Sequence, residues 1–307
     1  MLIVIVGPTG VGKTGISIKL AQKVKGEIIS ADSLQIYKEL NIGTAKPTKE
    51  QRNIVKHYLI DVYKPVFQIN AFNYAKKCRK IIKSIIAHGQ SPIMVGGTGL
   101  YIKAAIDGIF ESPPPDKNIR ELLERDCENN GLEFLYNELK RVDEISARKI
   151  HKNDKFRIIR ALEVYKSTGT PISKLQQFKK SLDGIDIVMI GIEMDRIRLY
   201  KRINDRVDLM IKNGLVEEVE KIIDKYKNYK NIVALKGLGY RHMHDYLHGK
   251  YSLISAINLM KKDTRKYAKR QMTWFKKDKR IIWITYEENI DDNVDEILNI
   301  IQNQRKD

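Results

Sequence analysis

Cysteine is scarce in this sequence, with only Cys78 and Cys127 among 307 residues. The two lie in different segments without the spacing of metal-ligating pairs, so neither a disulfide framework nor a zinc site is indicated. Long apolar runs are absent too. The opening MLIVIV is too short for the core of a signal peptide, and no stretch approaches the ~20 apolar residues that a membrane span needs. We therefore expect a soluble, cytoplasmic protein with structural thiols and no membrane association.

Acidic residues are few relative to basic ones. Asp and Glu number 38 against 56 Lys and Arg, which gives a formal net charge of +18 and a pI of about 9.6. Such a field attracts phosphate backbones, so the charge favours a polyanionic partner. The alternative is a Lys-rich proteome that raises the charge of every protein in the cell.

The first apolar segment runs into GPTGVGKT, which matches the phosphate-binding pattern G-x-x-x-x-G-K-[ST]. An apolar strand precedes it and a helical pattern follows, which is the context that this motif requires. Its glycines let successive backbone amides point at phosphate oxygens, and the helix dipole adds to that field. Lys13 is predicted to contact the terminal phosphates and Thr14 to hold Mg²⁺. The predicted diphosphate-binding residues are Gly7, Pro8, Thr9, Gly10, Val11, Gly12, Lys13 and Thr14; a Gly-rich turn without a ligand is the alternative.

Asp32 follows the second predicted strand, EIIS at residues 27–30. At the carboxyl end of a parallel strand, it lies where open α/β sheets bind their ligands. A GGTG turn at residues 96–99 ends a later strand and presents the Thr98 hydroxyl toward the same crevice. The other elements predicted in this part are strands over 57–62 and 91–101 and a helix over 72–87. Alternating strands and helices predict a P-loop NTPase-like, doubly wound parallel sheet.

This alternation breaks at three successive prolines, residues 113–115, which cannot continue a helix or a central strand. From 119 to 178 the periodicity is helical without a strand candidate, which predicts an all-helical insertion. The sheet resumes at 186–194, helices follow from 195 to about 275, and a last strand is predicted over 280–286. The predicted divisions are a first part of the P-loop core at 1–118, the helical insertion domain at 119–184, and completion of the core with a basic C-terminal helix at 185–307.

Residues 261–280 contain ten Lys or Arg against two Asp. On a helix, residues four apart lie on one ridge, so two adjacent ridges are predicted to form one continuous positive face. The ridges are Lys261, Arg265 and Lys269, and Lys262, Lys266 and Arg270. The alternative is a solvated helix whose aromatic residues dock on the core, although a merely soluble face usually alternates in sign.

A second basic segment, residues 152–165, carries Arg157 and Arg160 three apart on one predicted helix face. Ile158 and Ile159 between them are expected to pack. An ion pair of Arg160 with Glu163 is the alternative to RNA contact, and the sequence leaves the two open.

Several stretches together resemble the tRNA dimethylallyltransferase family. They run in order from Gly7 to Phe275 and cover nearly the whole chain: GPTGVGKT, DSLQIYKELNIGTAKP, HYLIDV, VGGTGLY, RIIRALEVYKSTGTPIS, RVDLMIKNGLVEEV and YAKRQMTWF. The second and the last are far more specific than the P-loop, which many families share. Lys152 and Phe156 depart from the family pattern, which more often has Pro and a polar or basic residue there, so the role of Phe156 is left open.

The resemblance implies transfer of a dimethylallyl group to the exocyclic amine of adenine 37, beside the tRNA anticodon, with release of pyrophosphate. That amine is a poor nucleophile, so a carboxylate at Asp32 could accept its proton, a task that general bases perform for ~10²–10⁴-fold. Ser33 and Gln35 carry groups that can read an adenine edge, and the base must leave its stack to react. Thr98 and Arg120 match family positions assigned to substrate RNA.

The residues predicted to act in catalysis are Asp32, Thr98, Lys13 and Arg120. For tRNA contact, the pattern and the resemblance together give Asp32, Ser33, Leu34, Gln35, Thr98, Arg120, Phe156, Arg157, Ile158, Ile159, Arg160, Lys262, Lys266 and Arg270. The implied ligands are dimethylallyl diphosphate, Mg²⁺ on Thr14, and the anticodon stem-loop of tRNA, bound by a monomer.

Three other functions fit part of the pattern. A small-molecule or nucleotide kinase also places an acid after the second strand, but it is usually shorter and does not need a 20-residue stretch with ten basic residues. An RNA-binding P-loop NTPase would hydrolyse ATP, yet the strand IMV ends in Gly-Gly rather than in the Asp of many NTPases. An adenylate isopentenyltransferase would use free AMP, ADP or ATP, whereas the helical insertion and the basic helix favour tRNA.

Overall fold

The computed structural model describes residues 1–111, 113–178, 181–229 and 231–304. Its chain forms two compact units. The first, called here the sheet unit, comprises Met1–Ile102 and Asp183–Asp307, and the second, called here the helical unit, comprises Lys103–Leu182. The sheet unit is thus built from both ends of the chain. The division predicted from the sequence places the helical insertion at residues 119–184.

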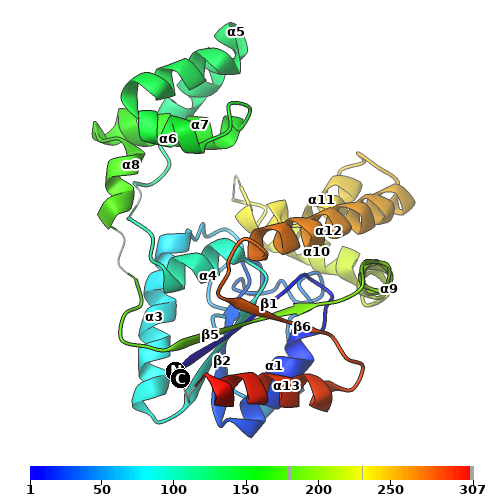
Figure 1. The fold of residues 1–307 in the computed structure, drawn as a ribbon. Helices are drawn as coiled ribbons and strands as arrows, with labels where there is room; N and C mark the ends of the chain where they lie inside the picture. The colour runs from blue at the N-terminus through cyan, green and yellow to red at the C-terminus, as the bar shows by residue number, and fades with distance from the viewer. Residues whose placement is uncertain (112, 179–180, 230, 305–307) are drawn as a thin grey trace. The chain divides into compact units, whose positions relative to one another are not determined.

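The sheet unit is built on one six-stranded sheet in the order β3-β2-β4-β1-β5-β6 (Figure 1). Every neighbouring pair of strands is parallel, which confirms the predicted α/β class with a parallel sheet. The strands are β1 Leu2–Val6, β2 Gly26–Ala31, β3 His57–Tyr58, β4 Ser91–Gly96, β5 Ile187–Glu193 and β6 Ile281–Thr285.

Two predicted strands are shorter than expected. The strand predicted over 57–62 ends at Tyr58, because Leu59 and Asp61 have left-handed φ angles of 60° and 57° that extended strands do not contain. The strand predicted over 91–101 ends at Gly96. Beyond it the carbonyl of Thr98 accepts hydrogen bonds from the amides of Tyr101 and Ile102, so a helix begins where the sequence indicated strand.

Nine described helices belong wholly or partly to the sheet unit. They are α1 Lys13–Lys23, α2 Lys49–Ile54, α3 Ala71–Ala87, α4 Gly99–Ile106, α9 Arg196–Lys212, α10 Leu215–Lys225, α11 Tyr240–Leu247, α12 Leu253–Phe275 and α13 Ile290–Asn303, joined by a 3₁₀ turn at Val233–Lys236. The predicted helices over 72–87 and from 195 to 275 are confirmed by α3 and by the run from α9 to α12.

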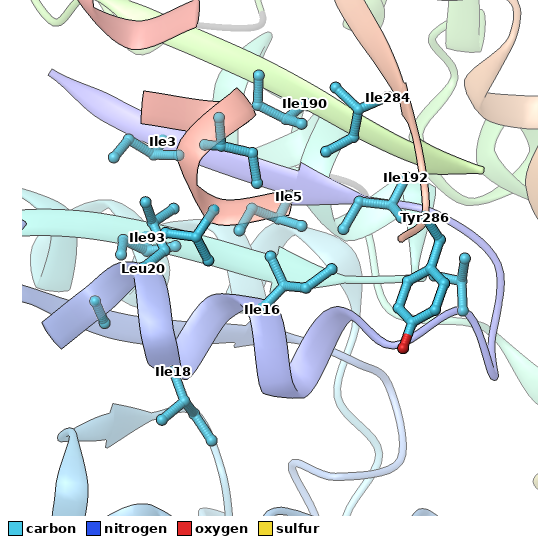
Figure 2. Close-up of a cluster of buried hydrophobic side chains, with 14 of the residues drawn as sticks. Ile3, Ile5, Ile16, Ile18, Leu20, Ile93, Ile190, Ile192, Ile284 and Tyr286 are labelled. Carbon is cyan, nitrogen blue, oxygen red and sulfur yellow. The ribbon is translucent and has the colours of Figure 1, made fainter. Parts of the chain in front are cut away.

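The sheet is covered on both faces, which explains why its strands are apolar throughout. On one face, Ile16 and Leu20 of α1 pack against Ile5 and Ile93 of the central strands, as Figure 2 shows, and α13 lies beside α1. On the other face, α3 contacts β2 and β4, and the buried Tyr74 hydroxyl donates to the Ser30 carbonyl at 2.9 Å. The core therefore holds the strand ends in fixed positions.

The helical unit contains α5 Lys117–Val142, α6 Glu144–Lys149, α7 Lys155–Thr168 and α8 Ile172–Leu175. Its core is a cluster that includes Leu123, Leu139, Ile158 and Leu162, and Gly131, at a φ of 82°, interrupts α5. The described residues of this unit contain no strand, so the helical prediction for 119–178 is confirmed. Among the helices described in either unit, none combines the length and apolarity needed to cross a membrane.

Candidate active site

Three loops meet at the carboxyl ends of the central strands. Gly96 of β4 is the neighbour of Val6 in β1 on one side and of Ala31 in β2 on the other. The P-loop follows Val6, Asp32 follows Ala31, and the turn that contains Thr98 follows Gly96. Because parallel strands end at the same edge, elements far apart in the sequence are brought together here, as the sequence predicted.

The P-loop has the backbone that phosphate binding requires. Gly12 stands immediately before α1 with a φ of 110°, a conformation that favours glycine. A Cβ at this position would lie 2.6 Å from the ring of Tyr286, whose side chain Figure 2 shows beside the start of α1. Glycine is therefore needed here both for its conformation and for space, and it leaves the amides of the first turn of α1 available to an anion.

Lys13 is held inward by its own loop. Its Nζ donates to the carbonyls of Gly7 and Pro8, both at 2.8 Å. Burial, together with the nearby Arg206 guanidinium, lowers the pKa of Lys13 to about 7, while the Asp32 carboxylate acts in the opposite direction. A phosphate in the loop would attract the Lys13 ammonium group and so oppose its repulsion by Arg206.

Asp32 is fixed by the turn that follows it. Its Oδ1 accepts from the amides of Leu34 at 2.8 Å and Gln35 at 3.1 Å. In the described part of the chain, no protein group donates a hydrogen bond to its other oxygen, Oδ2. The carboxylate is therefore oriented through one oxygen, and the second is available to a ligand.

Thr98 and Ser33 connect two of the loops. The Thr98 Oγ1 accepts a hydrogen bond from the Ser33 amide at 3.1 Å, so the turn after β4 supports the turn that carries Asp32. The Gln35 side chain accepts from the Ser30 hydroxyl at 3.1 Å and donates to the Thr44 carbonyl at 3.3 Å. The structure thus brings the predicted residues of the sheet-unit loops into one network.

Two cavities meet at Asp32. The larger, of about 470 Å³, is lined by the P-loop residues Thr9, Gly10 and Gly12 to Gly15 together with Asp32 and Gln35. The smaller, of about 180 Å³, adds apolar side chains that include Leu34, Ile203, Val207, Met210 and Met260. Five residues line both cavities: Thr9, Asp32, Thr44, Arg206 and Tyr267.

Two cavity residues on α12 were not predicted from the sequence. The Gln271 side chain accepts from the Thr9 amide at 2.9 Å and donates to the Gly97 carbonyl at 3.0 Å, so it joins the P-loop to the turn after β4. Tyr267 lines both cavities, and burial, followed by the Asp32 carboxylate, raises its pKa to about 12. The sequence shows both only as parts of a basic helix, because their partners lie far away along the chain.

Arg206 was missed as well, although the sequence contains a signal for it. It lies on α9 at helical spacing from the buried Ile203 and Met210, which places a cation on the apolar stripe of the helix. Its Nη2 donates to the Thr44 carbonyl at 3.3 Å. Burial lowers the pKa of Arg206 and the Asp32 carboxylate raises it, which is the environment of a cation placed to meet a buried anion.

The basic face of α12 differs from the prediction. Lys261 pairs with Asp208 at 2.6 Å and Arg265 donates to Asn204 at 2.6 Å, so two residues of the first ridge are directed to α9. The expected continuous face across both ridges is therefore wrong. The second ridge, formed by Lys262, Lys266 and Arg270, is exposed, and none of the three forms an ion pair within the residues described.

In the helical unit, a buried carboxylate holds two of the predicted arginines. Glu163 is 1% exposed and pairs with Arg160 at 2.7 Å and with Arg120 at 3.4 Å. The ion pair that the sequence left open therefore forms. Phe156 is 70% exposed, with the Arg120 guanidinium 5.5 Å from its ring centre, and Arg157 pairs with Asp154 at 3.4 Å.

The side chains of Ile158 and Ile159 lie in the core of the helical unit and are unavailable to RNA. They pack as the periodicity indicated, and their burial leaves almost no surface for the predicted tRNA contact at these two positions.

The Thr14 hydroxyl is suited to share a Mg²⁺ ion with a phosphate. Thr14 lies in the first turn of α1 and lines the larger cavity. Among the described residues, no group of three or more His, Cys, Asp or Glu could hold a metal ion by itself. Mg²⁺ usually keeps several waters and binds through one or two protein oxygens and substrate phosphates, and this set of residues fits that pattern.

A family profile described as IPP transferase matches residues 35–278. The chain belongs to the IPP transferase family. This assignment confirms the resemblance on which the sequence prediction depended and removes the kinase and NTPase alternatives.

Relatives of this family member match it along almost its full length. A tRNA dimethylallyltransferase of Acetivibrio thermocellus is 46% identical over 289 residues, which are 94% of this chain and 92% of the relative. The crystal structure of a tRNA isopentenylpyrophosphate transferase of Bacillus halodurans is 37% identical with a TM-score of 0.71, over 98% of this chain and 95% of the other. A eukaryotic dimethylallyltransferase acting on tRNA is 30% identical with a TM-score of 0.75, over 92% of this chain and 73% of the other.

Proposed function

We propose that this chain transfers the dimethylallyl group of dimethylallyl diphosphate to the exocyclic amine of adenine 37 in tRNA and releases pyrophosphate. The observation that carries the proposal is the position of Asp32, which lines both the P-loop cavity and the smaller, more apolar one. The diphosphate occupies the first cavity and the flipped adenine approaches from the second. The names of the relatives, a tRNA dimethylallyltransferase and a tRNA isopentenylpyrophosphate transferase among them, support the same pair of substrates.

The proposed step needs one base and one site for the leaving anion. The bond between the allylic carbon and the diphosphate oxygen breaks, and its electron pair leaves with pyrophosphate. A bond forms from the amine nitrogen to that carbon, and Asp32 takes the amine proton through Oδ2. Lys13, Arg206 and the P-loop amides stabilise the charge that develops on the leaving group.

We also propose that Thr14 would hold a Mg²⁺ ion together with the diphosphate, and that the ion would neutralise part of the leaving-group charge when bound. Thr98 would act by supporting the turn that carries Asp32 through the Ser33 amide. Ser33, Leu34 and Gln35 follow the base in that turn, where their polar groups can contact the adenine.

For the tRNA, we propose that the exposed ridge of α12 contacts backbone phosphates and that the helical unit contributes Arg120, Phe156 and Arg157. We further propose that the sheet unit has a P-loop NTPase-like fold and that the helical unit is a domain inserted into it. In this proposal the enzyme is a cytoplasmic monomer that binds one tRNA.

The test is a transfer assay with labelled dimethylallyl diphosphate and one acceptor at a time. We expect label in bulk tRNA and none in AMP. A matched transcript with guanine in place of adenine 37 is the control and should remain unlabelled. Label in AMP would assign the chain to the adenylate-using enzymes, and label in neither acceptor would contradict the proposed function.

A further inference from the structure

The loop at residues 41–44 orders the site without contributing a group to the proposed chemistry. The carbonyl of Thr44 accepts hydrogen bonds from Gln35 Nε2 and from Arg206 Nη2, both at 3.3 Å. Gln35 and Arg206 line the larger cavity together with Asp32. The position of one backbone carbonyl therefore sets the position of two side chains around the proposed base.

Glu218 on α10 holds this loop from outside the cavities. Its carboxylate accepts from three successive amides, those of Asn41 at 3.0 Å, Ile42 at 2.9 Å and Gly43 at 3.3 Å. Successive amides that converge on one anion form a concave binding site, and hydrogen bonds to an ionised acceptor are stronger than those between neutral groups. Glu218 is therefore an internal ligand that fixes the loop conformation.

Tyr240 completes the arrangement. Its hydroxyl donates to Glu218 at 2.6 Å, and its side chain is fully buried. A Cβ at Gly43 would lie 2.6 Å from the Tyr240 ring, so the loop packs directly against this ring. Burial, followed by the Glu218 charge, raises the pKa of Tyr240, which keeps the hydroxyl protonated as a donor.

A second contact between α10 and the same segment is of a different kind. Lys225 pairs with Glu39 at 2.7 Å, but the two side chains are 60% and 30% exposed. Exposed ion pairs of this type contribute little to the stability of the fold, since solvent screens the two charges. The structure thus contains a strong and a weak attachment of one segment to one helix.

We propose that Glu218, supported by Tyr240, is a positioning residue for the transfer reaction, because it holds the loop whose Thr44 carbonyl places Gln35 and Arg206 beside Asp32. The inference rests on the proposed function. Small misplacements at an active site reduce rates by up to ~10²-fold even when the change lies away from the reacting atoms. Neither residue is on the exposed ridge of α12, so tRNA affinity does not depend on them.

The experiment compares Glu218→Gln and Tyr240→Phe with Glu217→Gln and Lys225→Gln. Glu217 is the exposed neighbour of Glu218 on α10, and Lys225 belongs to the exposed pair, so both controls change charge on the same helix. We expect kcat to fall at least ~10-fold in Glu218→Gln and less in Tyr240→Phe, with KM for tRNA unchanged. Both controls should remain within about twofold of the wild type.

Hydrogen exchange of the loop amides gives a readout that requires no substrate. The amides of Asn41, Ile42 and Gly43 should exchange faster in Glu218→Gln than in Glu217→Gln. Faster exchange with an unchanged kcat would reduce Glu218 to a structural role and overturn the inference, as would equal exchange in the two variants. If Glu218→Gln does not fold, the isosteric Tyr240→Phe decides by the same two measurements. Absence of transfer by the wild type would contradict the proposed function, while the exchange result would still decide whether Glu218 orders the loop.

Discussion

The cations around the cavities and the cations on the exposed ridge of α12 differ in how the protein holds them. Lys13 donates to two carbonyls of its own loop, Arg206 donates to a third carbonyl, and Lys46, whose side chain is 2% exposed, pairs with Asp61 at 2.6 Å. Lys262 and Lys266 instead lie on an exposed ridge without an ion-pair partner in the described residues. The fold holds the first set in place, whereas the second set is exposed to solvent.

This difference fits the two sets to the two anions of the proposed reaction, the diphosphate and the tRNA. Fixed cations that line a cavity match a small anion of defined geometry such as a diphosphate, and they act without reorganisation when charge develops. Solvated cations along a helix match the repeated phosphates of a nucleic acid, whose binding depends on salt because counterions are released.

The largest expected effect comes from the acid between the buried cations. Asp32→Asn keeps an Oδ1 that can accept the Leu34 and Gln35 amides, so the turn should persist. It removes the proposed base, and the single-turnover transfer rate should fall by ~10² or more, while diphosphate affinity stays nearly unchanged. A rate close to that of the wild type would show that Asp32 is not the base.

The exposed ridge should respond to salt instead. Changing Lys262, Lys266 and Arg270 to Gln should weaken tRNA binding strongly at moderate salt and lower the slope of log K against log salt by about one unit or somewhat less per charge. Diphosphate binding should be unaffected, since no residue of the ridge lines the larger cavity. Filter binding at several salt concentrations measures both quantities.

A matched control for that variant lies on α3. Lys76, Lys80 and Lys83 are exposed there at a similar helical spacing, so their change to Gln removes the same charge from another surface. If both triple variants lower the slope of log K against log salt equally, the ridge contributes only through the general positive charge of the protein. If neither changes the slope, the ridge is a solvated face and the comparison between the two sets of cations fails.

What the sequence predicted well was local or topological. The P-loop from Gly7 to Thr14 carries its own turn chemistry, and the rule that parallel strands end at one edge was enough to bring Asp32 and Thr98 to it. The helical unit was predictable because its periodicity persists over several helices. None of these features depends on knowing how distant helices pack.

The residues that were missed depend on that packing. Gln271 meets Thr9 across 262 positions of the chain, and Glu218 reads as one more acid on an amphipathic helix until the loop at 41–43 is placed against it. The same limit explains the wrong face on α12. Spacing groups Lys261 with Arg265, but only the position of α9 shows that both are directed toward Asp208 and Asn204. Arg206 alone had a local signal, because it interrupts an apolar stripe.

The smallest expected effect concerns the proton on Lys13. With a pKa of about 7, Lys13 is about half neutral at pH 7 in the free protein. A bound diphosphate favours the charged form and raises that pKa, so binding takes up a proton: almost none below about pH 6, about half at pH 7 and nearly one at pH 8. The contribution of Lys13 to diphosphate affinity is therefore fully present below its pKa in the free protein. It is lost as the pH rises from about 7 toward the higher pKa that Lys13 has in the complex.

Isothermal titration of dimethylallyl diphosphate in buffers of different ionisation enthalpy measures this uptake directly. Lys13→Ala is the control, because the diphosphate carries protons of its own that titrate near pH 6 and must be subtracted. The variant should bind the diphosphate more weakly and transfer more slowly, since the lost charge acts in both the ground and the transition state. Its proton uptake at pH 8 should be smaller than that of the wild type by nearly one. Equal uptake in the two proteins would mean that Lys13 is already charged in the free site, and the contrast between fixed and solvated cations would then rest on position alone.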